Sequence, residues 1–450
     1  MSDPVVAYDA KHGVWLIHTL ALAGPSLKGA AMLVNRSTDG GLTWSNPIVA
    51  STPTGSSDFD KGWVACDNTP SSPHYGNCYM EWDDFGDLNR IKMSTSTDGG
   101  ATWGAAQDTA DAAVGIGGQP VVQPDGTVIV PIANDEEDAI LAFHSSDGGA
   151  TWSAAQTITA VSAHTAGGEL RTSPLPSAEI DGSGTVYVAW QDCGFEPACS
   201  ANDIVLSSSS DGTTWSVPAR IPIDPVSSGV DHFIPGLAVD PATSGAGAHL
   251  SLTYFYYPDA SCSTDCQLDI GNVFSVDGGA SWSSPLRLAG PMSLDWLAST
   301  TQGPMVGDYI STSFIGASAQ TVVPVATAPS SSFDEAMYAT SALPPNAPQA
   351  APANGFSLGK LKLNKKKGTA TQVVNLPGPG TLALSGAGIK GLNEQVAGGS
   401  VKLAIIPVGK KKRQVKRKHN AKIRIGVTFT PPGGSANTQA RKLTLKTRKR

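Results

Sequence analysis

The chain has 450 residues, more than one hydrophobic core usually organises, so we expect at least two folding units. Its 49 glycines and 32 prolines argue against long helices and favour an all-β fold of short strands joined by tight turns. The formal net charge of −7 hides a division, because residues 351–450 carry 22 basic side chains and one acidic one, Glu394. This stretch therefore has a charge of +21 against −28 for residues 1–350, which predicts two domains that have different partners or attract one another.

The first residues show no charged-then-apolar signal region, and no apolar run reaches the ~20 residues of a membrane span. Six cysteines fall into three local pairs. These pairs are Cys66 with Cys78, Cys193 with Cys199, and Cys262 with Cys266. Zinc is the alternative, but no pair has a second pair or a His at ligand spacing, so we expect disulfides. Disulfides imply a secreted or cell-surface protein whose signal peptide was trimmed or missed.

One octapeptide, Ser-x-Asp-x-Gly-x-Thr-Trp, recurs in the first 350 residues. It occupies residues 37–44, 96–103, 145–152 and 275–282, and returns one residue shorter in 209–215. Its Asp can accept hydrogen bonds from the turn's own amides, its Gly supplies a positive φ, and its Trp is expected to bury its ring between neighbouring sheets. Because strand-like runs flank every copy, each predicts a strand–turn–strand hairpin.

Two further strand candidates precede every copy, as residues 3–8 and 13–18 precede the first. Four strands per repeat are typical of a propeller blade. After the fifth copy the strand order begins again at residues 305–311 without an octapeptide. We therefore predict a six-bladed β-propeller in residues 1–342, followed by a semi-stiff, Pro- and Ala-rich linker in residues 343–355.

The octapeptide is the Asp-box, or BNR repeat, and five copies in a count of six blades resemble the sialidase (neuraminidase) superfamily over residues 1–345. Asp-boxes in that superfamily are structural hairpins on the face opposite the substrate site. The resemblance implies the same structural role for Asp39, Asp98, Asp147, Asp211 and Asp277.

Sialidases hold the sugar carboxylate with three arginines and use a tyrosine as nucleophile. The segment around Tyr309 looks like the family's nucleophile segment, although a core phenol is the alternative reading. A phenol of pKa ~10 needs a neighbouring base, for which Glu169 is our candidate, with Arg171 as the carboxylate clamp. The family's Phe-Arg-Ile-Pro signature is replaced by a segment beginning at Asp3, so its first arginine is missing, and its acid has no counterpart.

Inner strands of a propeller begin near the central funnel, so the polar residues at their starts are further candidates. Asp60 is the best replacement acid, although pairing with Lys61 is the structural alternative. The remaining candidates at strand starts, for substrate binding, are Lys61, Gln119, Asp231, His232 and Asp308. Residues 134–138 form a dense acidic turn that could hold Ca²⁺, but a solvated loop is favoured, and we expect no cofactor and no other metal.

Residues 356–450 contain runs that alternate at period two, in 401–406, 422–429 and 441–446, and predict a small β-sandwich-like domain. It loosely resembles the Lys-rich C-terminal modules of secreted bacterial proteins. Its basic clusters favour a polyanion bound by counterion release, either an anionic cell-wall polymer or the chain's own acidic part. Nucleic acid is less favoured because few aromatic residues are available for stacking. A merely solubilising surface is the other alternative.

Two hypotheses for function follow. The first is a secreted glycan-acting propeller that hydrolyses glycosides in the manner of an exo-α-sialidase. The second is a non-catalytic propeller that binds a glycan or a cell surface. The context of Tyr309 favours the first hypothesis, and the missing arginines favour the second.

Overall fold

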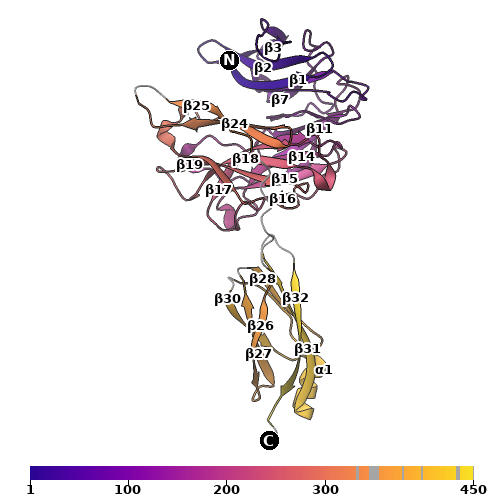
Figure 1. Cartoon of the computed structure of the whole chain (residues 1–450), viewed down its shortest axis with the longest axis vertical. Helices are drawn as coiled ribbons and strands as arrows, with labels where there is room; N and C mark the ends of the chain where they lie inside the picture. Colours follow the sequence, from indigo (N-terminus) through magenta and orange to yellow (C-terminus); the bar gives the residue numbers. More distant parts are fainter. Residues whose placement is uncertain (331–333, 344–353, 378–379, 397–398, 432–435, 449–450) are drawn as a thin grey trace. The chain divides into compact units, whose positions relative to one another are not determined.

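The computed structural model describes residues 1–330, 334–343, 354–377, 380–396, 399–431 and 436–448 (Figure 1). Two compact units divide the chain, Met1–Pro348 and Gln349–Arg450. Most of the predicted linker, residues 344–353, lies outside the described residues. No helix in the described ranges is long and apolar enough to cross a membrane.

The first unit consists of antiparallel sheets that follow one another along the chain (Figure 1). Sheet 1 contains β1 (Ser2–Asp9), β2 (Val14–Ala23), β3 (Lys28–Ser37) and β4 (Ile48–Ser51). Sheet 2 contains β5 (Phe59–Cys66), β6 (Cys78–Asp84) and β7 (Arg90–Ser96). Sheet 3 contains β8 (Gly115–Ile116), β9 (Val121–Val122), β10 (Val128–Asn134), β11 (Ala139–Ser145) and β12 (Gln156–Ala160).

The second half of this unit continues the same order. Sheet 4 contains β13 (Ser177–Ile180), β14 (Val186–Asp192), β15 (Asp203–Ser209) and β16 (Ala219–Arg220). Sheet 5 contains β17 (Asp231–Val239), β18 (Leu250–Tyr257), β19 (Gln267–Ser275) and β20 (Leu286–Ser293). The pair β21 (Ala298–Thr300) and β22 (Gly303–Met305) precedes sheet 6, which contains β23 (Ser311–Ile315), β24 (Ser318–Ala326) and β25 (Glu335–Ala339).

Short 3-10 helices occur only in the connections of this unit, within the described ranges. They are η1 (Phe85–Asp87), η2 (Gly167–Glu169), η3 (Pro197–Cys199), η4 (Gly245–Gly247) and η5 (Leu294–Trp296). The expected all-β fold is confirmed.

Each octapeptide forms the same hydrogen-bonded turn. In the third copy the Asp147 carboxylate accepts from the Thr151 amide at 2.9 Å, the Thr151 hydroxyl at 2.6 Å and the Ser145 hydroxyl at 2.8 Å. These hydrogen bonds, first of all that from the Thr151 hydroxyl, lower the pKa of Asp147 to about 2. In the shorter fourth copy, Asp211 keeps the bond from the Ser209 hydroxyl, at 3.1 Å, and accepts from the Thr213 and Thr214 amides at 2.8 and 2.6 Å.

The turns also join neighbouring sheets, because each packs on the sheet before it. Gly149 has a positive φ of 82° and lies so close to sheet 2 that a side chain there would collide with Thr95. Trp282 of sheet 5 is only 2% exposed and belongs to a core shared with sheet 4.

Trp44, in the first turn, does not follow this rule and is 37% exposed. The expectation that every Trp buries its ring between sheets is therefore wrong for Trp44, because no earlier sheet covers the first turn. The Trp44 indole instead donates to the carbonyl of Gly41, in its own turn, at 3.0 Å.

The outer faces of sheets 1 and 6 are both exposed. On sheet 1, Tyr8 and Trp15 are opposite one another on paired strands, with ring centroids 4.8 Å apart, and each is 39% exposed. On sheet 6, Val322 and Met337 are 42% and 64% exposed. The count of six blades stays a prediction, because these two faces do not cover one another as adjacent blades of a closed ring would.

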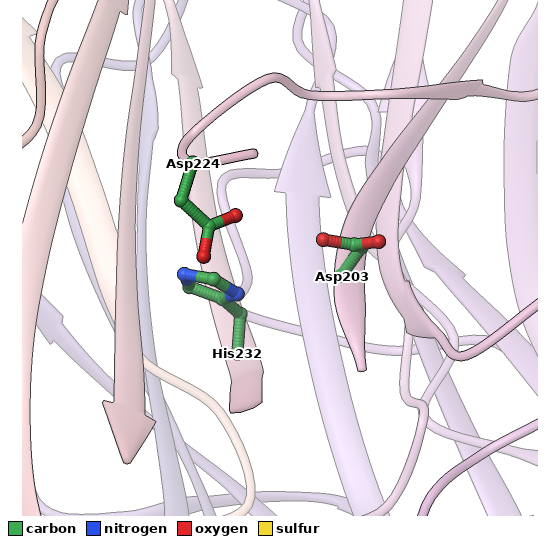
Figure 2. Close-up of side chains that lie close together, drawn as sticks. All are labelled: Asp203, Asp224 and His232. Atoms are coloured by element: carbon green, nitrogen blue, oxygen red, sulfur yellow. The ribbon is translucent and has the colours of Figure 1, made fainter. Parts of the chain in front are cut away.

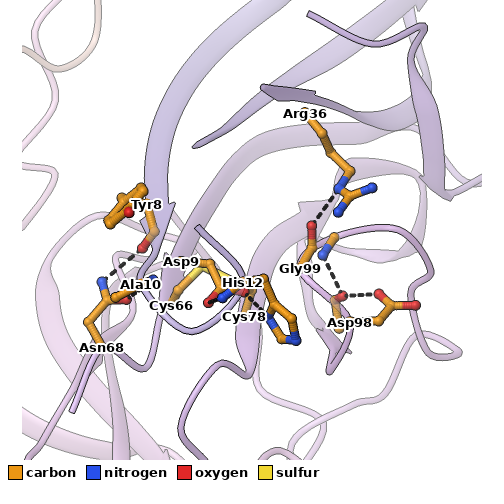
Figure 3. Close-up of a disulfide and its surroundings, with 12 residues drawn as sticks. Tyr8, Asp9, Ala10, His12, Arg36, Cys66, Asn68, Cys78, Asp98 and Gly99 are labelled. Atoms are coloured by element: carbon orange, nitrogen blue, oxygen red, sulfur yellow. Dashed lines mark hydrogen bonds and ion pairs between the residues drawn. A yellow bond between two sulfur atoms is a disulfide. The ribbon is translucent and has the colours of Figure 1, made fainter. Parts of the chain in front are cut away.

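All three predicted disulfides are confirmed. Cys66 and Cys78 are directly paired residues of β5 and β6, and Figure 3 shows their bond beside the β1–β2 turn of sheet 1. Asn68, just after this β5 end, accepts from the Ala10 amide at 2.7 Å and donates to the Tyr8 carbonyl at 2.8 Å. The disulfide therefore stabilises a connection that also holds sheet 2 against sheet 1.

The second unit is a small two-sheet domain around one apolar core, whose buried residues include Leu403, Ile425 and Phe429. One sheet contains β26 (Ser357–Asn364), β27 (Thr369–Leu376) and β30 (Gly399–Ile405). The other has the order β29 (Leu392–Val396), β28 (Gly380–Ser385), β31 (Asn420–Thr430) and β32 (Asn437–Lys446). The helix α1 (Gly409–Lys418) precedes β31 and buries Val415 in the core.

Substitution of Asp147 by Ala tests the role of the turn. The variant loses a charged acceptor for three hydrogen bonds, so we expect the free energy of unfolding to fall by about 1–2 kcal/mol. Urea unfolding followed by tryptophan fluorescence measures the change. Asp265→Ala, in an exposed loop, is the control and should change stability by less than about 0.5 kcal/mol. Equal losses in the two variants would show that the turn contributes nothing specific.

Candidate functional site

Six side chains from four parts of the first unit meet in what we call the charged cluster. Its members are Asp3 of β1, Asp60 and Lys61 of β5, Arg171 of the η2–β13 loop, and Asp308 and Tyr309 of the β22–β23 connection. The Lys61 ammonium contacts the Asp308 carboxylate, and the Arg171 guanidinium lies 2.7 Å from the same carboxylate oxygen. These contacts join positions up to 247 residues apart in the sequence.

Tyr309 sits within this cluster and is half-buried. Its hydroxyl donates to the Asp3 carboxylate at 3.0 Å. Its ring meets the Trp63 ring edge-on at 5.3 Å, and the Lys61 ammonium lies 5.7 Å from its centroid. Burial, together with the negative charge of Asp3, raises the pKa of Tyr309 well above its ordinary value. The phenol is therefore protonated at neutral pH and can lose its proton only to a group such as Asp3.

Buried carboxyl groups lie beside the cluster. Burial raises the pKa of Asp60, and the charge of Lys61 partly offsets that rise. Asp83 of β6 is directly opposite Asp60 in the strand pair, and Asp83 and Glu81 are both completely buried. Burial raises the pKa of both well above the usual range, which favours their uncharged forms. Three acids in the seven residues of β6, Glu81, Asp83 and Asp84, were a signal that our sequence analysis missed.

The space inside the cluster is small. A cavity of about 10 Å³ is lined by Lys61, Trp63, Gln119, Leu175 and Tyr309, among others. This volume holds about one water molecule and not a sugar ring. Since both cations already bind Asp308, an anionic ligand would have to displace that carboxylate in order to bind them.

Several predicted site residues lie elsewhere. Glu169 is the last residue of η2, and its backbone carbonyl lies against Gly303. The Tyr309 hydroxyl donates to Asp3 and not to Glu169. The expectation that Glu169 serves as the base of Tyr309 is corrected accordingly. Gln119 is buried and accepts from the Ala178 amide at 2.9 Å, so it joins sheets 3 and 4.

Asp231 and His232, at the start of β17, are buried away from the charged cluster. Asp231 accepts from the Asn202 amide at 2.7 Å and lies 3.0 Å from a ring nitrogen of His164. The His232 ring packs against two tyrosines, Tyr254 and Tyr256, and burial lowers its pKa to about 4. Buried in this way, neither residue is placed to bind substrate.

Asp203, Asp224 and His232 form a group with metal-ligand atoms close together, drawn in Figure 2. The Arg220 guanidinium lies 2.7 Å from Asp203 and 2.5 Å from Asp224, so a cationic side chain already pairs with both carboxylates. This group does not fit a metal ion.

The acidic turn of residues 134–138 is closed by Asn134. The Asn134 side-chain amide donates to Asp138 at 2.7 Å and to Glu136 at 3.1 Å, and its carbonyl oxygen accepts from the Asp138 amide at 2.9 Å. These bonds account for the turn as a solvated loop.

The half-buried Glu179 of β13 gives the first unit a pH dependence that can be measured. Burial raises the pKa of Glu179 to about 8, so the folded state holds this proton to higher pH than the unfolded chain does. Its contribution to stability therefore falls as pH rises from about 4.5 to about 8. We expect the melting temperature of Glu179→Gln to fall less than that of the wild type over this interval. Parallel profiles in calorimetry would contradict the assignment.

The first unit was compared with known families and structures. Residues 79–237 match the model of the BNR repeat-like domain family. No curated protein matches the chain.

Several solved structures are similar at low identity. A Hadza microbial sialidase has 16% identity and a TM-score of 0.44, with 75% of this chain and 65% of that chain covered. A leech intramolecular trans-sialidase has 12% identity and a TM-score of 0.44, with 72% of this chain and 64% of that chain covered. A Penicillium chrysogenum α-L-arabinanase has 13% identity and a TM-score of 0.40, with 70% of this chain and 87% of that chain covered. This chain thus spans slightly less than two thirds of the two sialidase-type proteins. The similarity to the BNR repeat-like domain family is thus confined to residues 79–237, about a third of the chain.

Proposed function

We propose that the first unit acts on glycans as a glycoside hydrolase of sialidase type, with Tyr309 as nucleophile and Asp3 as its base. The observation that carries this proposal is the hydrogen bond of 3.0 Å from the Tyr309 hydroxyl to Asp3. A phenol that donates to a carboxylate has the arrangement in which a base activates a weak nucleophile.

The chemistry would proceed through a covalent glycosyl-enzyme. The Tyr309 oxygen bonds to the anomeric carbon while its proton passes to Asp3, and the bond to the leaving oxygen breaks. Asp60, whose pKa burial raises, would supply the proton that the leaving oxygen takes up. Water then attacks the anomeric carbon and loses a proton to Asp60, and the phenol oxygen takes its proton back from Asp3.

An acidic sugar would bind through Arg171 and Lys61. Arg171 is 28% exposed and reaches from the cluster toward solvent, so its guanidinium fork is the accessible clamp for a carboxylate. The substrate carboxylate would exchange with Asp308, which occupies both cations in the absence of ligand. Opening of the cluster therefore has to accompany binding.

A second candidate function is glycan binding without catalysis. It is favoured by the pairing of both cations with Asp308 and by a cavity that holds about one water molecule. In that case the charged cluster only holds sheets 1, 2 and 6 together, and the glycan binds on an outer loop surface.

For the second unit we propose polyanion binding. Its support is the +21 charge of residues 351–450 and the exposure of the α1 lysines and arginines. The three disulfides favour a secreted or cell-surface protein, in which an anionic cell-wall polymer is the expected partner.

A panel of aryl glycosides that includes sialosides tests the hydrolase proposal. We expect turnover by the wild type, and a loss of kcat of at least 100-fold in Tyr309→Phe, which removes the nucleophile and keeps the ring. Asp3→Asn should lower kcat similarly and keep KM within a few-fold. Tyr338→Phe, at an exposed tyrosine of β25, is the matched control and should leave kcat unchanged.

Turnover that is unchanged in Tyr309→Phe would exclude this tyrosine as nucleophile. Absence of turnover, combined with glycan binding that Tyr309→Phe does not alter, would establish the second candidate instead.

Asp308→Asn separates the role of the cations from that of the nucleophile. The variant releases Lys61 and Arg171 from a carboxylate, so we expect tighter binding of acidic sugars than of neutral ones, seen as a lower KM or Kd for sialosides. Calorimetric titration of N-acetylneuraminic acid and galactose measures the difference. An equal change for both sugars would contradict a clamp at this position.

A further inference from the structure

The second unit has a groove of about 690 Å³ on the outer face of β31 and β32. Gly426 and Ala440, which are directly opposite one another, keep part of its floor free of large side chains. Beside small and apolar residues such as Gly386, Ala387 and Leu443, four basic residues also line the groove. They are Lys422 and Arg424 of β31, Lys442 of β32, and Lys411 of α1.

The positive charges of this groove repel one another. Arg424 and Lys442 are direct cross-strand partners on the same face, and Lys422 precedes Arg424 by two residues on the same strand. Like charges in directly opposite positions destabilise a strand pair. Glu394, the only acid in residues 351–450, lies on β29, which β28 separates from β31. A bound anion would relieve this repulsion.

Lys411 is held in place at the side of the groove. Its ammonium donates to the Lys422 carbonyl at 2.8 Å. Its stem packs against Gly388, which has a positive φ of 80° and where any side chain would overlap Lys411. This fixed lysine and the paired cations of the strands make the groove a built site and not only part of a diffuse basic surface.

We propose that this groove binds a linear polymer of phosphate diesters that carries no bases. A phosphate offers two oxygens to the Arg424 fork, and lysines provide the neighbouring point charges. Phe356 and Phe429 are buried at 8% and 0% exposure, so neither is available to stack on a nucleobase. The proposal rests on polyanion binding by the second unit and assigns that binding to one groove.

The test uses the full-length chain and fluorescent poly(glycerol phosphate) in anisotropy titrations over a range of salt concentrations. The groove variant is Lys422→Gln, Arg424→Gln and Lys442→Gln combined. The control variant, Lys360→Gln, Lys362→Gln and Lys402→Gln, removes the same charge from exposed positions of the other sheet, where Lys362 and Lys402 face the uncharged Thr371 and Val373.

We expect the groove variant to lose at least 10-fold in affinity at 0.1 M salt and the control to lose less than threefold. The slope of log K against log salt should fall by about two in the groove variant, at roughly 0.7 for each lost phosphate contact. Equal losses of affinity in both variants would overturn the assignment of binding to this groove, while the proposal that the second unit binds polyanions would stand. Absence of binding by the wild type would overturn both proposals, and tighter binding of single-stranded DNA than of the polymer would favour a nucleic acid.

A second readout is the melting temperature, measured first without ligand and then with the polymer. Arg424→Gln removes the like-charge pair with Lys442, so we expect its melting temperature to exceed that of the wild type without ligand. Lys362→Gln should leave the melting temperature unchanged. Addition of poly(glycerol phosphate) should raise the melting temperature of the wild type more than that of Arg424→Gln. A lower melting temperature of Arg424→Gln without ligand would show that repulsion between Arg424 and Lys442 does not destabilise the unit.

Discussion

The hydrogen-bonded turn of the octapeptide sets the spacing between sheets on which the first unit depends. Its Asp closes the turn, its glycines allow the backbone to approach the preceding sheet, and its Trp fills the space between the two. Two examples of this packing of a turn on the preceding sheet are Gly149 against Thr95 and Trp282 in the core shared by sheets 4 and 5. Because the contact repeats along the chain, each sheet is held at a defined place relative to the one before it.

That spacing brings the first strands of the sheets near one another, so that several carboxylates of the charged cluster lie close together and repel one another unless cations accompany them. Asp3, Asp60 and Asp308 converge there with Lys61 and Arg171, and both cations contact Asp308 while Asp3 accepts from Tyr309. Burial raises the pKa of the neighbouring Asp83 and Glu81, which favours their uncharged forms. Tyr309 also takes part in this network, because its hydroxyl donates a hydrogen bond to the Asp3 carboxylate. Whatever ligand enters has to replace a charge that the protein already supplies.

The sequence predicted the features that local chemistry determines. Octapeptide hairpins and disulfides with separations of 12, 6 and 4 residues need no knowledge of distant contacts. The bond between Tyr309 and Asp3 joins residues 306 positions apart, and no periodicity in the sequence reports it. The sequence indicates Glu169 as the base of the phenol, whereas the fold brings Asp3 to it. His232 was expected in the funnel from its place at a strand start, but the tyrosines of β18 enclose it.

The exposed outer faces of sheets 1 and 6 determine how cooperative the first unit can be. Sheets in a closed ring each have two neighbours, whereas Tyr8 and Trp15 on one side and Val322 and Met337 on the other leave the terminal sheets with one each. Such a unit resembles a linear array whose stability is a sum of nearest-neighbour terms. The contacts of Tyr309 with Asp3 and of Lys61 with Asp308 couple the two ends, and only when they break can sheets 1 and 6 fray independently while the middle of the array stays folded. Whether the ends stay together thus depends on the same few charged groups that would have to open for a ligand.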